Sequence, residues 1–264
     1  MPRPTTTLLA PVSGLASAAF AALSAARRKR IFHPEGLGYR ASLRVEVGLS
    51  DYEGVPLLAE PGSHDAIVRC SRGAGLPESL PDVLGLAVRL PDLHGPGAHQ
   101  DFLLASSGDG LLLHLLLLPA PGGFFGQSYS SILPYRVGGA LRLVGAVPVR
   151  PPTPAEGTDL EQLDEAASDH QARFHLALAG LGGRWQQFGT LSLLERLTGD
   201  ETEALTFNPW NTGGGFRPTG PLMGLRDPAY RGSQWGRGAR TGASGMPADD
   251  PPTEATTRTA SRPS

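Results

Sequence analysis

Cysteine and lysine are almost absent from this chain, and neither sign of charge dominates it. Of 264 residues one is a cysteine, Cys70, which excludes an intramolecular disulfide and a cysteine-rich metal site. We expect Cys70 to be a small buried apolar residue. One residue is a lysine, Lys29, and the formal net charge is −2, so the charge balance does not favour a nucleic-acid partner.

Long uninterrupted apolar runs are also missing. Residues 8–26 are apolar and rich in alanine, but the charged run Arg27–Arg30 follows this stretch, whereas a signal peptide carries its charges first. Pro11 and Ser13 interrupt the stretch and disfavour a transmembrane span. We therefore expect a surface helix over residues 8–29, no membrane partner and a cytoplasmic location.

Glycine and proline are abundant, with 35 and 25 residues, and predict many turns. Alternating and short apolar patterns predict several strands between these turns. Spaced antiparallel strands with a few helices are typical of a closed barrel, so we expect an α+β fold in which an antiparallel β-barrel carries peripheral helices. The expected strands cover residues 39–47, 66–71, 84–90, 101–105, 141–149 and 204–207, and a strand or helix is expected at 185–196.

The remaining segments divide the chain into three parts. Residues 159–181 begin with acidic residues and end before a glycine-rich stretch, a pattern that predicts a helix. Periodicity cannot decide whether Leu111–Leu118 is a buried strand or a helix. Residues 238–264 lack aliphatic and aromatic core residues apart from alanine and Met246, so we expect a disordered tail. The expected domains are an N-terminal helical arm (1–29), a core (30–237) and this tail.

Two segments carry the strongest chemical signal: Arg30-Ile-Phe-His33 and Arg226-Asp-Pro-Ala-Tyr230, the latter followed by Arg237. A tyrosine phenolate is one of the standard axial ligands of haem iron. A histidine on the opposite face can accept and return a proton. Arginines can pair with the haem propionates or with the phenolate oxygen. Together the segments supply what a haem with a tyrosine ligand needs.

These segments resemble haem catalases. Short matches to that family come in the family's order, from about residue 28 to residue 238. Arg30–Gly36 is similar to the segment of the distal histidine, Val68–Ser71 to the Val-Arg-Phe-Ser segment whose arginine contacts a propionate, Gly85–Leu90 to the strand that follows, Phe207–Pro209 to a Phe-Asp-Pro segment, and Arg226–Tyr230 with Arg237 to the segment of the proximal tyrosine.

The resemblance implies a catalase-like haem-binding core over residues 30–237 that holds one haem b. It makes Tyr230 the iron ligand, His33 the group that promotes cleavage of the peroxide O–O bond, and Arg226 the residue that tunes the phenolate. It places three arginines at propionate-binding positions: Arg30, Arg69 and Arg237. The implied function is that of a haem-dependent peroxidase or catalase-like oxidoreductase of oxidative stress, which uses a peroxide and a reducing co-substrate. The resemblance leaves a homo-oligomer open.

The chain also departs from the family's pattern. Catalases carry a distal asparagine after a short Asp-containing strand, whereas Asp101–Gly108 contains no asparagine. The chain is much shorter than a typical catalase, and Gln127–Tyr129 with Leu133–Gly138 is more similar to the minimal catalase-related proteins of bacteria. These departures favour peroxidase or organic hydroperoxide activity over efficient disproportionation of hydrogen peroxide.

Two other functions stay open. The first is a non-catalytic protein of the same fold that binds haem or, without haem, another ligand. The second is a metal-dependent phosphodiesterase or hydrolase, for which His64-Asp65 and His99-Gln-Asp101 are weak signals without a metal-ligand spacing. His114, within the leucine run, is expected to be a satisfied core histidine. Gly213–Gly215 lacks the following Lys-Ser/Thr of a phosphate loop.

Overall fold

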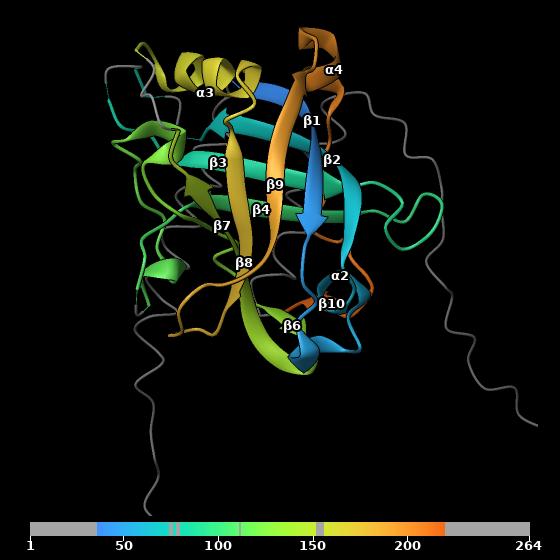
Figure 1. Ribbon diagram of the computed structural model, residues 1–264. Coiled ribbons are helices and arrows are strands. Elements are labelled where there is room, and N and C mark those ends of the chain that lie inside the picture. The colour runs from blue at the N-terminus through green and yellow to red at the C-terminus, as the bar shows by residue number, and fades with distance from the viewer. Residues whose placement is uncertain (1–35, 74–75, 78–79, 111, 152–155, 220–264) are drawn as a thin grey trace, which may run out of the picture.

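The computed structural model describes residues 36–73, 76–77, 80–110, 112–151 and 156–219. Ten strands and several short helices make up this part of the chain (Figure 1). The strands are β1 (Gly36–Val45), β2 (Gly62–Arg72), β3 (Leu84–Leu90), β4 (Gln100–Ser106), β5 (Tyr129–Ser130), β6 (Tyr135–Val137), β7 (Ala140–Val149), β8 (Arg173–Ala179), β9 (Gln186–Arg196) and β10 (Phe216–Pro218). The α-helices are α2 (Pro56–Ala59), α3 (Asp159–Ser168) and α4 (Gly199–Ala204), and 3-10 turns cover Ser50–Tyr52, Leu113–Leu115 and Gly123–Phe125.

Eight of the strands close into a barrel. The hydrogen-bonded order runs β7-β5-β4-β3-β2-β1-β9-β8, and β8 pairs again with β7 to close the sheet. Every pairing is antiparallel, and β6 with β10 extends the sheet beside β7. The expected α+β fold with an antiparallel barrel is therefore confirmed. Closure leaves no free edge among the eight strands, and this satisfies their backbone hydrogen bonds.

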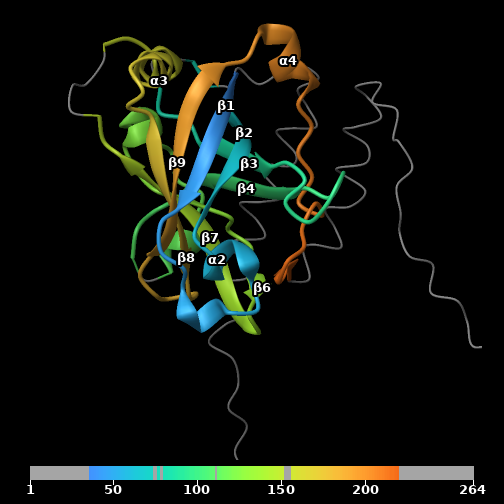
Figure 2. The same cartoon turned by 45° about the vertical axis from the view of Figure 1, so that its right-hand side comes forward.

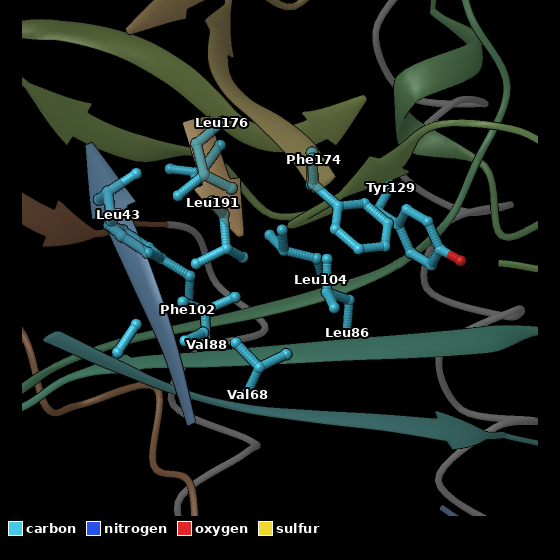
Figure 3. Packing of buried hydrophobic residues seen from close by; sticks show 14 of the residues in the cluster. Leu43, Val68, Leu86, Val88, Phe102, Leu104, Tyr129, Phe174, Leu176 and Leu191 are labelled. Carbon is cyan, nitrogen blue, oxygen red and sulfur yellow. The ribbon is translucent and has the colours of Figure 1, made fainter. Parts of the chain in front are cut away.

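Side chains fill the interior of the barrel. The strands alternate buried and more exposed positions, so that every second residue points inward. Leu43, Val68, Val88, Phe102 and Leu191 converge on the centre of the barrel, and Figure 3 shows them pointing toward one another from different strands. All five are less than 2% exposed. An eight-stranded barrel is just wide enough for such side chains, so its lumen has no room for a large cofactor.

Helices α3 and α4 lie at the same end of the barrel, and α2 lies with β6 and β10 at the other end (Figures 1 and 2). Both α3 and α4 begin with a capping box, in which a threonine hydroxyl accepts a hydrogen bond from the backbone N–H of a glutamate and the glutamate carboxylate accepts one from the backbone N–H of the threonine. These threonines are Thr158 and Thr198. Peripheral helices were expected around the barrel, and α3 and α4 are both peripheral, although α4 itself was not predicted.

A buried ion-pair cluster fixes α3 to the barrel. The guanidinium of Arg72, 2% exposed, pairs with Asp159 at the start of α3 and lies 3.9 Å from the carboxylate of Asp82. It also donates to the carbonyl oxygens of Pro77 and Leu80. Burial raises the pKa of Asp159, while Arg72 acts in the opposite direction. The cluster thus connects α3, Pro77 and Leu80 to the end of β2.

Three expected elements are wrong in extent or type. The helix expected at 159–181 ends at Ser168, because His170 adopts a left-handed backbone with φ 58°, and strand β8 follows it. The strand expected at 204–207 is instead the end of α4 and a loop. Leu111–Leu118 is neither a strand nor an α-helix, because its described part forms a 3-10 turn at Leu113–Leu115 and extended loop.

Residues 185–196, left open between strand and helix, form β9. The expected N-terminal arm at 1–29 and the expected tail at 238–264 lie outside the described residues. Within the described ranges, no helix is both long enough and apolar enough to cross a lipid bilayer.

Candidate functional site

The outward-facing residues of β1–β4 are unusually small over part of their length. The strand registers place Gly36, Ser71, Gly85 and Ala105 side by side in one row across the four strands. The next row contains Gly38, Arg69, Ala87 and Leu103. We call these two rows the small-residue face. Apart from Arg69 and Leu103, the side chains of these rows are short, so little of them rises above the backbone of the four strands.

Close strand packing requires two of the glycines. A Cβ at Gly36 would lie 2.6 Å from the carbonyl oxygen of Cys70, and a Cβ at Gly85 would lie 2.9 Å from the Ser71 hydroxyl. Both positions are half-buried. A larger residue at either position would displace the neighbouring strand or the Ser71 side chain, and its own side chain would protrude from the face.

Arg69 stands in the second row, half-buried, between Gly38 on β1 and Ala87 on β3. Its guanidinium is one of the cations expected to hold a haem propionate. The inward neighbour on β2 is Cys70, which is fully buried, and burial raises the pKa of its thiol well above the ordinary value. Cys70 therefore stays a neutral apolar residue, as expected, and is not suited to bind iron as a thiolate.

Helix α4 borders the small-residue face on the side of β1. A Cβ at Gly38 would lie 2.6 Å from the hydroxyl oxygen of Thr202 and 3.2 Å from Leu197, so α4 and the end of β9 pack directly on this glycine. The backbone N–H of Leu197 also donates to the carbonyl oxygen of Gly38. In the second row, the uncovered part of the face thus begins at β2, whereas the atoms nearest to a Cβ at Gly36, in the first row, belong to β2 and not to α4.

The segment Thr206–Asn211 borders the face at its other end and is held by Asp101. This carboxylate is fully buried and accepts hydrogen bonds from Arg89 Nε at 2.8 Å and Nη2 at 2.7 Å. It also accepts from the backbone N–H of Asn208 and from Asn211 Nδ2. The Arg89 guanidinium lies 5.2 Å from the ring centroid of Phe207, a cation–π contact. We call this arrangement the Asp101 clasp.

Gln100, next to Asp101, attaches the residues that follow the clasp to β4. Its buried side-chain oxygen accepts from Thr212 Oγ1 at 3.2 Å and from the backbone N–H of Gly213. His94 Nε2 lies 3.1 Å from the same oxygen, and its ring packs against Gly213 and Gly214. Gly213–Gly215 is therefore a packed connection into β10, and the phosphate-loop interpretation has no support in this geometry.

Most of the residues expected to act on haem lie outside the described part of the chain: Arg30, His33, Arg226, Tyr230 and Arg237. Arg69 is the one expected site residue that the structure places. The structure begins at Gly36, in the first row of the small-residue face, and ends at Thr219, just after β10. The chain thus enters the described fold at the face itself.

The alternative metal-hydrolase signals do not converge among the described residues. No group of three or more His, Cys, Asp or Glu side chains in these ranges is placed to hold a metal ion. Asp101 is occupied by the clasp, and the His99 ring accepts a hydrogen bond from the backbone of Asp92 at 3.0 Å. His114 is 1% exposed, and its Nε2 lies 3.0 Å from the carbonyl oxygen of Gly183, so it is a core histidine as expected. It is not fully satisfied, because its buried Nδ1 has no hydrogen-bond partner among the described residues.

The sequence interpretation missed the clasp and the border formed by α4. Asp101 and Gln100 precede an otherwise apolar strand, and two adjacent buried polar residues at a strand start are a usable signal for such a clasp. Thr198 and Glu201 have the spacing of a capping box, which could have placed α4. The small-residue face consists of outward-facing residues of β1–β4, and these residues can be recognised as neighbours only once the strand register is known.

Comparison with known proteins supports the fold. No protein-family model matches the chain, and no curated protein matches it. Among solved structures, the crystal structure of a fungal catalase is similar, with a TM-score of 0.60 and 12% sequence identity. The match covers 83% of this chain and 61% of the catalase chain, so this chain spans less than two thirds of that protein. The structural similarity establishes a shared barrel fold. Because the identity is so low, it does not establish the activity, which has to be argued from the site.

Proposed function

We propose that this protein is a haem-dependent peroxidase or catalase-like oxidoreductase whose haem b binds on the small-residue face. One observation carries the proposal. The barrel interior is filled, while its exterior offers a row of small residues beside Arg69, in a fold similar to that of a fungal catalase. A planar cofactor with anionic substituents would find both an apolar surface and a cation there.

The described residues fit a haem in size and chemistry. The first row crosses four strands, which is about 14 Å at the usual interstrand spacing, so the surface is wide enough for a porphyrin ring. Gly85, Ala87, Leu103 and Ala105 are apolar and half-buried, and they offer contact without protruding. Arg69, in the second row, would hold a propionate by a charge-assisted hydrogen bond.

The chain would supply the reacting groups from both ends of the described fold. His33 precedes Gly36 by three positions, and three residues span at most about 11 Å, so His33 lies within reach of the small-residue face. Tyr230 would provide the phenolate ligand and Arg226 a positive charge beside its oxygen. Arg30 and Arg237 would hold propionates together with Arg69. A bound ferric haem supplies the metal centre at which the peroxide is cleaved.

His33 would move one proton during the reaction. It would accept a proton from one oxygen of the peroxide and deliver it to the other, departing oxygen, so that the O–O bond would break with loss of water or an alcohol. Two electrons and two protons from a reducing co-substrate complete the turnover, in which ROOH becomes ROH and water. The Ser71 hydroxyl, in the row that Gly36 begins, is the polar group of the face best placed to orient His33.

The alanine at position 105 would affect which peroxide the proposed site reduces best. It faces outward in the first row, where it adds a methyl group and no hydrogen-bond donor. Ser71 is the single polar side chain of that row, so a second molecule of hydrogen peroxide would be held weakly. We therefore infer higher peroxidase or organic hydroperoxide turnover than disproportionation of hydrogen peroxide.

Replacement of Arg69 by glutamine tests the placement of haem. Loss of one charge-assisted hydrogen bond is expected to speed haem release roughly 10-fold or more. The measurement is the rate of haem transfer from the Arg69→Gln variant to apomyoglobin. Arg44→Gln is the matched control, because Arg44 is an outward arginine of β1 that lies beyond the face. Equal transfer rates for wild type, Arg69→Gln and Arg44→Gln would contradict the proposed position of the haem.

A non-catalytic role of the same face is the second candidate. The observation that favours it is the chemistry of the two rows, which contain no histidine, aspartate or glutamate within the described residues. A protein that binds stoichiometric haem and reduces neither hydrogen peroxide nor an organic hydroperoxide would fit this role, as would one that leaves haem unbound and takes another flat ligand.

A further inference from the structure

A polar groove of about 650 Å³ lies on the outer surface of β8, β9 and β1. Two rows of outward side chains form its floor. In one row Arg173, Ser192 and Ser42 are neighbours across the three strands. In the other row His175, Thr190 and Arg44 are neighbours. The two rows are about 7 Å apart along the strands, and directly opposite side chains lie about 5 Å apart.

The two arginines stand at diagonal corners of this floor, with the hydroxyls of Ser192 and Thr190 between them. The inward neighbours on the same strands are Leu191, Leu193 and Phe174, all buried in the core. The core therefore fixes the register of the strands, and the register in turn holds the outward polar grid in place. The floor is thus rigid at its backbone before any ligand arrives.

The polar groups of this floor are poorly satisfied within the protein. Over the described ranges, the Arg173 guanidinium and the hydroxyls of Ser42 and Ser192 make no hydrogen bond or ion pair with the chain. Arg44 has one carboxylate near it, Glu46, at 3.9 Å and on an exposed surface, where such a pair contributes little. Thr190 receives a hydrogen bond from Gln187 and lies 3.4 Å from the ring of His175.

Arginines outnumber carboxylates among the residues that line the groove. Arg44 and Arg173 face one lining carboxylate, Glu46, while His170 and His175 add donors. Asp65 stands beside Ser42 in the register of β1 and β2, and it lines the neighbouring groove. An anion is thus expected on the side of β8 and β9, between the two guanidinium groups.

We propose that this groove binds a small molecule that carries an oxyanion, a phosphate or carboxylate group, between Arg173 and Arg44 over the hydroxyls of Thr190 and Ser192. Planar guanidinium groups and serine or threonine hydroxyls are the donors that such oxygens accept from. The groove is larger than one inorganic anion, so the rest of the ligand would lie along the strands. The site lies apart from the small-residue face and does not depend on haem.

Titration of the full chain with inorganic pyrophosphate and, separately, with citrate tests the site. Ionic strength is kept constant with potassium chloride, and binding is followed by the backbone amide signals in heteronuclear NMR. Saturable shifts are expected at residues of β8, β9 and β1, with a Kd of about 1 mM, the affinity of a few charge-assisted hydrogen bonds. Binding of pyrophosphate alone identifies a phosphate group, and binding of citrate alone a carboxylate.

Variants assign the binding to the named residues. Arg173→Gln and Arg44→Gln should each weaken binding roughly 10-fold, while Arg136→Gln, which removes an exposed arginine of β6, should leave it unchanged. Thr190→Ala removes one hydroxyl without changing charge and serves if an arginine variant is unstable. Absence of saturable shifts with both anions up to about 50 mM would overturn the proposal, as would equal weakening by Arg136→Gln.

Discussion

Alanine in place of His33 is expected to slow peroxide turnover at least about 100-fold while haem stays bound, the usual loss when a general acid–base group is removed. The physical reason is the composition of the small-residue face. Its described residues are glycine, alanine, leucine, serine and arginine, and none of them can accept a proton near neutral pH. His33 lies three positions before Gly36, so it is the nearest histidine along the chain.

Stopped-flow measurement of the reaction with hydrogen peroxide and with an organic hydroperoxide checks this expectation. His64→Ala is the matched control, because His64 lies at the opposite end of β2 from Ser71 and should leave turnover unchanged. A His33→Ala protein whose rate stays within about threefold of wild type would assign the proton transfer to another group.

Alanine in place of Asp101 is expected to lower the free energy of unfolding by about 3–5 kcal/mol, the cost of leaving a buried charge without its partner. Asp101 is fully buried, while the Arg89 side chain is 17% exposed. The substitution would also leave the backbone N–H of Asn208 and the Asn211 amide without their acceptor. Since these contacts hold Thr206–Asn211 to the barrel, that segment should detach before the barrel unfolds.

Urea unfolding gives the change in stability, and hydrogen exchange locates it. Asp101→Asn keeps an acceptor oxygen and should lose less stability than Asp101→Ala. Glu195→Ala removes an ion pair with Arg40 that is exposed on both sides, so its effect should be small. Equal stability of Asp101→Ala and Glu195→Ala would show that the clasp does not stabilise the fold.

The strands were predictable because half of each strand is buried. β3 was expected at 84–90 and is found at Leu84–Leu90, since Leu84, Leu86, Val88 and Leu90 alternate with smaller or polar residues. The same alternation occurs in Arg173–Ala179, which forms β8. Because a helix pattern precedes it directly, the predicted helix was extended over this strand. The left-handed backbone conformation of His170 separates the two elements. No glycine or proline stands at this position to indicate the end of the helix.

The sequence predicted a closed barrel, but the strand pairings that close it and the shape of the outer surface could not be derived from the sequence. Closure depends on the pairing of β7 with β8 and of β1 with β9, contacts between segments that no local pattern links. Gly36, Gly85 and Ala105 read as ordinary strand or turn residues until the register brings them into one row. The polar floor made by Arg173 and Arg44 is invisible for the same reason.

The position of Arg69 was predictable only through the resemblance to catalases. An arginine in a strand is usually a solvated or ion-paired residue, and its sequence neighbours do not distinguish a propionate ligand. The structure places Arg69 on the outer side of the barrel, beside Ala87, with a small-residue surface around it. That placement makes the haem expectation specific enough to test.

The most direct test of the central claim is the absorption spectrum of the purified protein titrated with haemin, for the wild type and for Tyr230→Phe. The account predicts a stoichiometric Soret band with high-spin ferric charge-transfer bands typical of a phenolate ligand, and loss of these charge-transfer bands in Tyr230→Phe. A wild-type protein that stays colourless at saturating haemin would contradict haem binding on the small-residue face. Charge-transfer bands that persist in Tyr230→Phe would contradict Tyr230 as the iron ligand.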